Sequence, residues 1–352
     1  MTALKRLCAL GAGFLALGLG ASACGLAPYV AKVNGQVITR SYLFSELNAI
    51  SGNPAYVASY AKQGVTVRGK AKGTFTTSFV DQVLNQQISV TLVHQADRKR
   101  GIKITPADLS LARTDLVSTV GNSKALSDFP KSYQDFLVRS TAEYTALEGS
   151  LANVPVTQAA VDKYYAAHRA ELTNLCVSLI VLPTKAKATK VEASLHKGGN
   201  FAALAQADSQ NASTGAKGGA VGCSIPQAFV QAYGPTVGKQ VQSLGVGKYG
   251  PAVKVSTSSH ATAYVVASVT SKTPLTETKA TPIILGLQLN PVMTKLNSYL
   301  AKMGKAAKIS VDPSYGRFTL KNGSPDVLAP TKPPASDLVL PTGTTTTTSG
   351  SG

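Results

Sequence analysis

The sequence predicts an α+β protein in which a mainly helical module is interrupted by an inserted α+β domain. Apolar residues recur at helical spacing from about residue 39 to 172, and the pattern then changes to a β-type run at 176–182. Helical spacing returns near 291–305, so we assign the C-terminal helix to the first module. A chain of 352 residues also suggests about two domains.

The N-terminus has the features of a secretory signal peptide over residues 1–23. Lys5 and Arg6 precede a short apolar run at 7–20, and small residues lead to Cys24. One alternative is an ordinary cut after Ala23 that leaves a free thiol. The other is a lipobox in which Cys24 carries lipid, although Ala21 stands where Leu, Val or Ile is usual. We expect the second, an exported protein anchored by lipid on the extracellular face of the cell membrane, because an unpaired cysteine there otherwise has no purpose.

The helical module, expected over residues 24–172, opens with a hairpin. Asn34-Gly35 between short apolar alternations favours a type I′ turn within 30–38, and Thr39 is suited to cap a helix over about 41–50. Further helices are expected at about 76–98, from Thr105-Pro106, at 131–151 and from 155 to about 171. The basic run 98–100 followed by Gly101 is what a helix C-terminus prefers.

The inserted domain is expected over residues 173–271. A strand at 176–182 stops at Pro183, and helices follow at about 186–196 and 200–205. A glycine-rich loop spans 213–222, and strands are expected at 253–255 and 264–269. Residues 272–323 then return to the first module. From about Ser324 the chain is rich in Pro, Thr, Ser and Gly, which predicts a disordered tail over 324–352.

The charge is strongly basic, with 35 Lys and Arg against 17 Asp and Glu. Nucleic-acid binding is one use of such a charge. The basic residues are scattered without interleaved aromatics, and export also argues against it, so we expect acidic unfolded chains or an anionic surface as partners. His94, His168 and His196 lie on expected helices without metal-ligand spacing, and His260 lies in a Ser/Thr-rich turn. No cofactor or metal is indicated.

Several segments together resemble SurA-like chaperones that contain a parvulin-type (PpiC-like) domain. Residues 33–39 resemble the start of the chaperone domain, and 311–317 look like a closing motif of actinobacterial SurA-like lipoproteins. The inserted domain resembles parvulin through the strand at 178–181, the "G-x-F-x-x-L-A" segment at 199–205, Ser209 with the glycine loop 218–222, the turn 244–251 and the strand 264–269. The resemblance covers most of the chain beyond the signal, and it rests on the order of the motifs rather than on any one of them.

Parvulins are peptidyl-prolyl isomerases, which lower a rotation barrier of about 18–20 kcal/mol at X–Pro bonds. The family uses an apolar proline pocket beside two histidines and a Cys or Asp. The resemblance places Ser178, Asn211 and Val265 at these three positions, with Tyr264 in place of Val265 if the register slips by one, and Ala220 replaces the aspartate of the glycine loop. No Asp or Glu occurs from Ser209 to Thr276. This implies weak or absent isomerase activity.

The resemblance also bears on the remaining cysteines and on the pocket. Cys176 and Cys223 are an even pair in an exported chain, either two buried thiols or a disulfide. The parvulin alignment puts the strand of Cys176 beside the loop before Cys223, which favours a structural disulfide over a redox switch. Phe229 and Tyr233 are candidates for the substrate pocket, with ordinary core residues as the alternative.

Three functions remain open at this point. The first is a chaperone that holds unfolded exported polypeptides and has weak or no isomerase activity. The second is an active isomerase with an atypical site around Ser178 and Asn211. The third is a non-catalytic lipoprotein that binds the cell envelope through its lipid and its basic surface.

Overall fold

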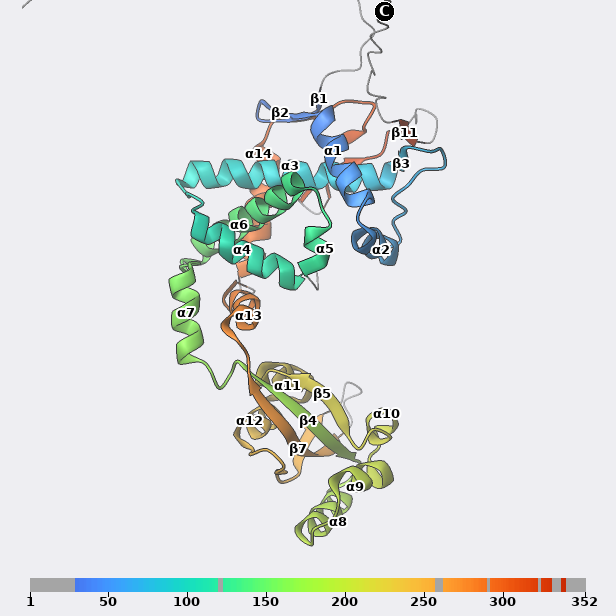
Figure 1. Ribbon diagram of the computed structural model, residues 1–352, viewed down its shortest axis with the longest axis vertical. Helices are drawn as coiled ribbons and strands as arrows, with labels where there is room; N and C mark the ends of the chain where they lie inside the picture. The colour runs from blue at the N-terminus through green and yellow to red at the C-terminus, as the bar shows by residue number, and fades with distance from the viewer. Residues whose placement is uncertain are drawn as a thin grey trace, which may run out of the picture.

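A computed structural model describes residues 29–119, 123–256, 262–289, 292–321, 324–330 and 337–339. The expected signal peptide, Cys24 and His260 lie outside the described residues. Figure 1 shows two bodies joined by a narrow connection: a helical module, and a smaller domain built on a sheet. Among the described residues, no helix is long and apolar enough to cross a membrane.

The first part of the helical module alternates short strands with long helices. Its elements are β1 (Tyr29–Val33), β2 (Gln36–Thr39), α1 (Arg40–Ser51), α2 (Pro54–Lys62), β3 (Thr74–Thr76), α3 (Thr77–Arg100), α4 (Pro106–Thr119), α5 (Ser123–Ser127) and α6 (Lys131–Ala152). The chain returns to this module as α13 (Glu277–Leu289), α14 (Met293–Ala306), β8 (Ile309–Val311), β9 (Arg317–Lys321), β10 (Ser324–Leu328) and β11 (Asp337–Val339).

Local sequence explains the start of the module. Asn34 and Gly35 both have positive φ, 52° and 86°, as a type I′ turn requires, and they join β1 to β2 as expected. The Thr39 side chain accepts a hydrogen bond from the Tyr42 amide and caps α1. Helix α3 ends at Gly101 in the left-handed conformation. Its buried face, which includes Phe79, Leu84 and Ile88, crosses the centre of the module.

The C-terminal segments complete the core of this module. Strand β8 pairs with β1, so that β1 lies between β2 and β8 in a three-stranded sheet. Strand β10 pairs with β9, and its Val327 is buried in the main core. Residues 324–328 therefore belong to the folded body, and the expected start of a disordered tail at Ser324 is too early. The apolar alternation of β10 is short and becomes stable only through pairing with β9.

The inserted domain is a four-stranded antiparallel sheet in the order β5-β4-β7-β6. Its strands are β4 (Thr173–Leu182), β5 (Ala220–Ser224), β6 (Val253–Ser256) and β7 (Thr262–Pro274). Its helices are α8 (Lys185–His196), α9 (Phe201–Asp208), α10 (Ala212–Gly215), α11 (Pro226–Tyr233) and α12 (Pro235–Ser243). Helices α11 and α12 cover the face that carries Leu179, and α8 and α9 cover the face that carries Ile180.

The connection between the bodies consists of α7 (Gln158–Ala167) and α13, with the chain entering at β4 and leaving at β7 (Figure 1). The Leu275 amide donates to the Leu172 carbonyl over 3.0 Å, and the Tyr165 hydroxyl donates to the Leu275 carbonyl over 2.6 Å. These bonds hold the entering and leaving segments side by side. The fold is thus a mainly helical module with an inserted α+β domain, as the sequence predicts.

Candidate functional site

Ser178 lies in the middle of the sheet of the inserted domain. Strand β4 places it opposite Ser268 on β7 and Ala220 on β5, and it is only 6 % exposed. The Ser268 hydroxyl donates to the Lys248 carbonyl over 3.0 Å. The surroundings of Ser178 are thus neutral and hydroxyl-bearing, and Ala220 contributes no carboxylate where the parvulin pattern has an aspartate.

Val265 does not meet Ser178, because the two residues face opposite sides of the sheet. Val265 pairs with Val181 and packs against Leu179 in the core beneath α11 and α12. Side chains alternate along a strand, so Ser178 shares its face with Tyr264, Val266 and Ser268 instead. The alternative position, Tyr264, lies on the face of Ser178, opposite Leu182.

Asn211 is exposed and caps a helix. Its Oδ1 accepts the Thr214 amide at 3.3 Å and the Ser213 hydroxyl at 2.9 Å, at the start of α10. In the glycine loop that follows, close packing against β4 requires a residue without a side chain at position 219. Gly219 has φ of 85°, its carbonyl accepts the Leu179 amide at 2.8 Å, and a Cβ there would lie 2.6 Å from the Leu179 carbonyl oxygen.

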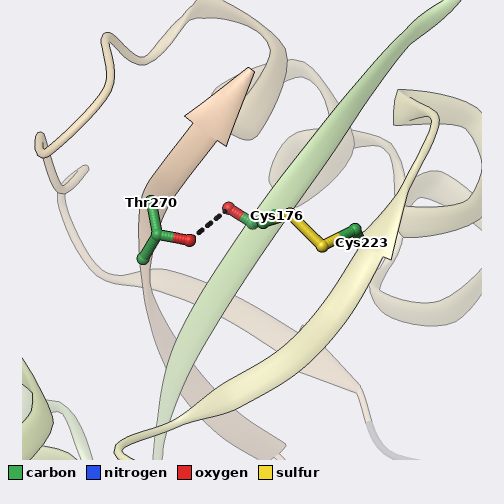
Figure 2. Close-up of a disulfide and its surroundings, with 3 residues drawn as sticks. All are labelled: Cys176, Cys223 and Thr270. Carbon is green, nitrogen blue, oxygen red and sulfur yellow. Dashed lines mark hydrogen bonds between the residues drawn. A yellow bond between two sulfur atoms is a disulfide. The ribbon is translucent and has the colours of Figure 1, made fainter. Parts of the chain in front are cut away.

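Cys176 and Cys223 form a disulfide between directly opposite residues of β4 and β5 (Figure 2). Cys223 is exposed and Cys176 is half-buried. The ladder from β4 to β7 is irregular beside Cys176, and the Thr270 hydroxyl donates to the Cys176 carbonyl over 3.1 Å, as Figure 2 shows. The bridge thus fixes β5, which is an edge strand, to the centre of the sheet.

Phe229 and Tyr233 both pack in the core of the inserted domain. Phe229 is buried in the core between the sheet and α11, and Tyr233 packs against the same core, where burial raises the pKa of its hydroxyl. Neither residue forms a proline pocket with Ser178, which lies on the other face of the sheet.

A different hollow, with a cavity volume of ≈ 390 Å³, lies on the helical module. Strand β2 and helices α1, α3 and α6 supply its walls. The lining residues are Gln36, Val37, Ile38, Thr39, Tyr42, Gln87, Val90, Thr91, His94, Phe136, Arg139, Ser140 and Glu143.

The rim of this hollow is apolar and aromatic on one side. Val37 is 48 % exposed and Tyr42 is 44 % exposed, so both present apolar surface to solvent. The rings of Tyr42 and Phe136 meet edge to face with centroids 5.9 Å apart. Phe136 in turn stacks on Tyr133, so the exposed ring of Tyr42 continues into the aromatic core of the module.

The hollow also carries charged groups, on α3 and α6. The carboxylate of Glu143 lies 3.1 Å from Nδ1 of His94 and 3.4 Å from Nη1 of Arg139. The Glu143 side chain is only 5 % exposed, whereas His94 is 39 % and Arg139 56 % exposed. The carboxylate therefore lies behind the two nitrogen-bearing side chains as seen from solvent.

Beneath the hollow lies a buried carboxyl, Glu46 of α1. Gln87 Nε2 donates to it over 2.6 Å and the Tyr133 hydroxyl donates over 3.2 Å. Burial raises its pKa to about 7, although both hydrogen bonds act in the other direction. Burial, and to a smaller extent the charge of Glu46, raises the pKa of Tyr60 to about 12.

The sequence patterns did not identify this hollow. His94 was placed on a helix without a role, and the other lining residues are far apart in the sequence. The available signals were local ones, such as the apolar Val37 beside a turn and Tyr42 on the exposed side of α1.

Comparison with known proteins places one family on this chain. The model of the PPIC-type PPIase domain (rotamase) matches residues 182–261, and no curated protein matches. The chain therefore contains a PPIC-type domain within the inserted body.

Three solved structures illustrate the similar proteins. The peptidylprolyl isomerase PrsA from Bacillus cereus shares 18 % identity with a TM-score of 0.34, over 82 % of this chain and 95 % of that one. The foldase protein PrsA from Streptococcus pneumoniae shares 16 % with a TM-score of 0.36, over 77 % and 89 %. A SurA-like chaperone from Campylobacter jejuni shares 16 % with a TM-score of 0.25, over 80 % and 99 %.

Proposed function

We propose that this protein is a folding factor for exported polypeptides, which holds unfolded segments on its helical module and has weak or no isomerase activity. The observation that carries the proposal is the hollow between β2 and α6 with its exposed apolar rim, in a chain that also contains a PPIC-type domain. Unfolded chains expose apolar side chains, and burying them contributes about 25 cal/mol per Å².

The positions of the family's catalytic groups support weak turnover. An isomerase must stabilise a twisted amide electrostatically. Ser178 is a buried neutral hydroxyl, the Asn211 oxygen is occupied in a helix cap, and neither Val265 nor Tyr264 supplies an imidazole. A domain with these residues retains the family's shape for contact with peptides while its reactive groups are replaced.

An aggregation assay tests the holding activity. The protein is expected to delay aggregation of a chemically unfolded substrate, and the variants Val37→Ser and Tyr42→Ser are expected to weaken that effect. Val246→Ser serves as the matched control, because Val246 is 56 % exposed but lies on the inserted domain. No delay by the wild-type protein, or equal loss in all three variants, would remove the proposal.

A protease-coupled proline-isomerisation assay separates this proposal from an active isomerase. The chain from Gly25 onward with the disulfide formed is expected to show a rate close to background, unchanged in Ser178→Ala. A rate well above background that falls in Ser178→Ala or Asn211→Ala would instead establish an isomerase with a rebuilt site.

The cellular location belongs to the same proposal: an exported lipoprotein of actinobacterial type, anchored by Cys24 on the extracellular face of the membrane. The signal-like N-terminus and the disulfide support export, because disulfides persist in oxidising compartments. Cys24→Ser is expected to abolish labelling by a fatty-acid analogue and to release the protein from membranes. Salt-sensitive retention on envelope fractions without any chaperone effect would favour a non-catalytic envelope-binding protein instead.

A further inference from the structure

We infer that the hollow between β2, α1, α3 and α6 selects extended polypeptide segments that carry an apolar or aromatic side chain two residues before an acidic one. The inference rests on the proposed holding function and specifies its client. It follows from the charge that the hollow presents, from the spacing of its two sides, and from the free edge of β2.

The charge exposed in the hollow is positive. Arg139, Glu143 and His94 are the charged or protonatable lining residues apart from the Tyr42 phenol. Within the described residues, Glu143 contacts Arg139 only through Nη1, and arginine has five N–H donors in a planar fork. Glu143 thus engages one nitrogen of a guanidinium whose side chain is 56 % exposed, and the other donors of the fork are suited to a carboxylate.

The apolar and cationic sides lie one helical turn apart. Phe136 and Arg139 are separated by three positions on α6, so their Cβ atoms are about 5–6 Å apart on one face of the helix. In an extended peptide, side chains at i and i+2 share a face and are about 6.5–7 Å apart. A residue of the Phe or Leu type at i and Glu or Asp at i+2 therefore matches the two sides together.

The edge of β2 favours an extended polypeptide as the occupant. Within the described residues, β2 pairs with β1 alone, and all four of its residues line the hollow. The pair that closes a two-residue hairpin is hydrogen-bonded, here Val33 with Gln36, and bonded pairs alternate with unbonded ones. The amide and carbonyl of Val37 consequently point away from β1 and are available to a strand laid beside it.

The whole chain has the complementary sign. Its formal net charge of +18 attracts acidic segments over a distance and repels basic ones. Long-range attraction alone would not distinguish one acidic peptide from another. The hollow adds a local requirement, because the carboxylate and the apolar side chain must be engaged at the same time.

Fluorescence anisotropy with two short peptides tests the inference. Both are acetylated, amidated and extended, and they differ only in carrying Phe-x-Glu or Phe-x-Gln. The full-length protein is expected to bind the Glu peptide about two- to fivefold more tightly. Arg139→Gln is expected to abolish the preference while still binding the Gln peptide, and Arg139→Lys is expected to retain part of it. Arg113→Gln is the matched control, since it removes the same formal charge from the helical module at a residue that does not line the hollow of Arg139 and Tyr42.

The outcomes are distinguishable from failure of the proposed function. Equal affinity of the wild-type protein for the two peptides would overturn the inference. This comparison does not depend on whether any variant folds. A preference that Arg113→Gln removes as completely as Arg139→Gln would also overturn it, since net charge would then suffice. Self-association that competes with peptide, together with equal affinities, would assign the hollow to a second copy. If the protein still delays aggregation, the proposed holding function stands whichever of these peptide results is found. If it neither delays aggregation nor binds peptide, the holding function is removed as well.

Discussion

At the scale of single residues, the buried carboxyl of Glu46 makes the stability of the helical module depend on pH. Its pKa is about 7 in the folded protein against an ordinary value of 4.5. Asp81 and Asp97 behave similarly, since burial raises the pKa of each to about 7. At pH values between its ordinary pKa and about 7, each of the three carboxyls is protonated more fully in the folded state than in the unfolded state. Their stabilising contribution is therefore complete at low pH and is lost as the pH rises through 7.

Glu46→Gln is expected to flatten this dependence. The wild-type protein should melt at a higher temperature near pH 5 than near pH 8, because ionisation of the buried carboxyl opposes folding. The glutamine variant carries no ionisable group, so it should gain roughly 2 kcal/mol relative to wild type at pH 8. Denaturant unfolding monitored by circular dichroism at both pH values measures the effect.

The control for Glu46 is Asp208→Asn, which removes an exposed carboxyl on α9 of the other body. This variant should keep the pH dependence of wild type. A Glu46→Gln variant whose stability changes with pH as steeply as that of wild type would show that the other buried carboxyls dominate.

The residues of the expected isomerase site differ in how firmly the sequence pattern places them on one face of the sheet. Ser178 was assigned from a strand with a clear apolar pattern, and it lies in the middle of that strand. Val265 was assigned within an almost uniformly apolar strand, where the pattern does not fix the register. Because side chains alternate, an error of one residue moves the assignment to the other face of the sheet.

At the scale of elements, the glycine loop before β5 has a packing role that is separable from its turn geometry. Gly219 in this loop and Gly222 within β5 both have positive φ, 85° and 102°. A Cβ at Gly219 would lie 2.6 Å from the Leu179 carbonyl oxygen, whereas no atom lies within 4 Å of a Cβ at Gly222. The two positions therefore share backbone strain and differ in contact.

Gly219→Ala is expected to destabilise the inserted domain by about 2 kcal/mol more than Gly222→Ala. Backbone strain alone costs about 1–2 kcal/mol for a left-handed residue, and the clash with β4 adds to it at Gly219. Urea unfolding midpoints of the two variants provide the comparison. Equal losses would mean that the loop moves away from β4 without cost.

The disulfide is the covalent counterpart of that loop. It closes a sequence separation of 47 residues and joins the edge strand β5 to β4. The double variant Cys176→Ser, Cys223→Ser is expected to lose about 2–4 kcal/mol of stability. Wild-type protein treated with reductant should unfold like the double variant, and reductant should leave the variant unchanged. A variant as stable as oxidised wild type would contradict a structural role for the bridge.

The elements also show which parts of the fold depend on local sequence. The Asn34-Gly35 hairpin, the Thr39 cap and the end of α3 at Gly101 were predicted because each is decided by a few adjacent residues. The pairing of β8 with β1 was not, since its partners are almost the whole chain apart. The same holds for β10, whose pairing with β9 was hidden in a Pro-rich segment. The hollow was missed for a related reason, because four separate elements form it.

At the scale of the whole molecule, the two bodies have separate cores. The cores of the inserted domain draw on residues from Leu175 to Val269, and the main core of the helical module draws on residues outside that range. A third cluster, around Leu172 and Ile284, lies at the connection and belongs to α7, α13 and α4. Cooperative unfolding follows shared buried contacts, so this division predicts two transitions.

Residues 173–274 alone are therefore expected to fold. Within the sheet, β4 and β7 are the first and last strands along the chain, and Thr173 of β4 pairs with Pro274 of β7, so the cut ends lie side by side. The isolated segment should unfold within about 5 °C of the corresponding transition in the full chain, since a domain of this size depends mainly on its own core. Reductant should lower this transition in both samples. It should leave the second transition of the full chain unchanged, because the disulfide lies wholly in the inserted domain. A single transition of the full chain that reductant shifts as a whole would show that the cluster around Leu172 couples the two bodies, and a client held on one would then be sensed by the other.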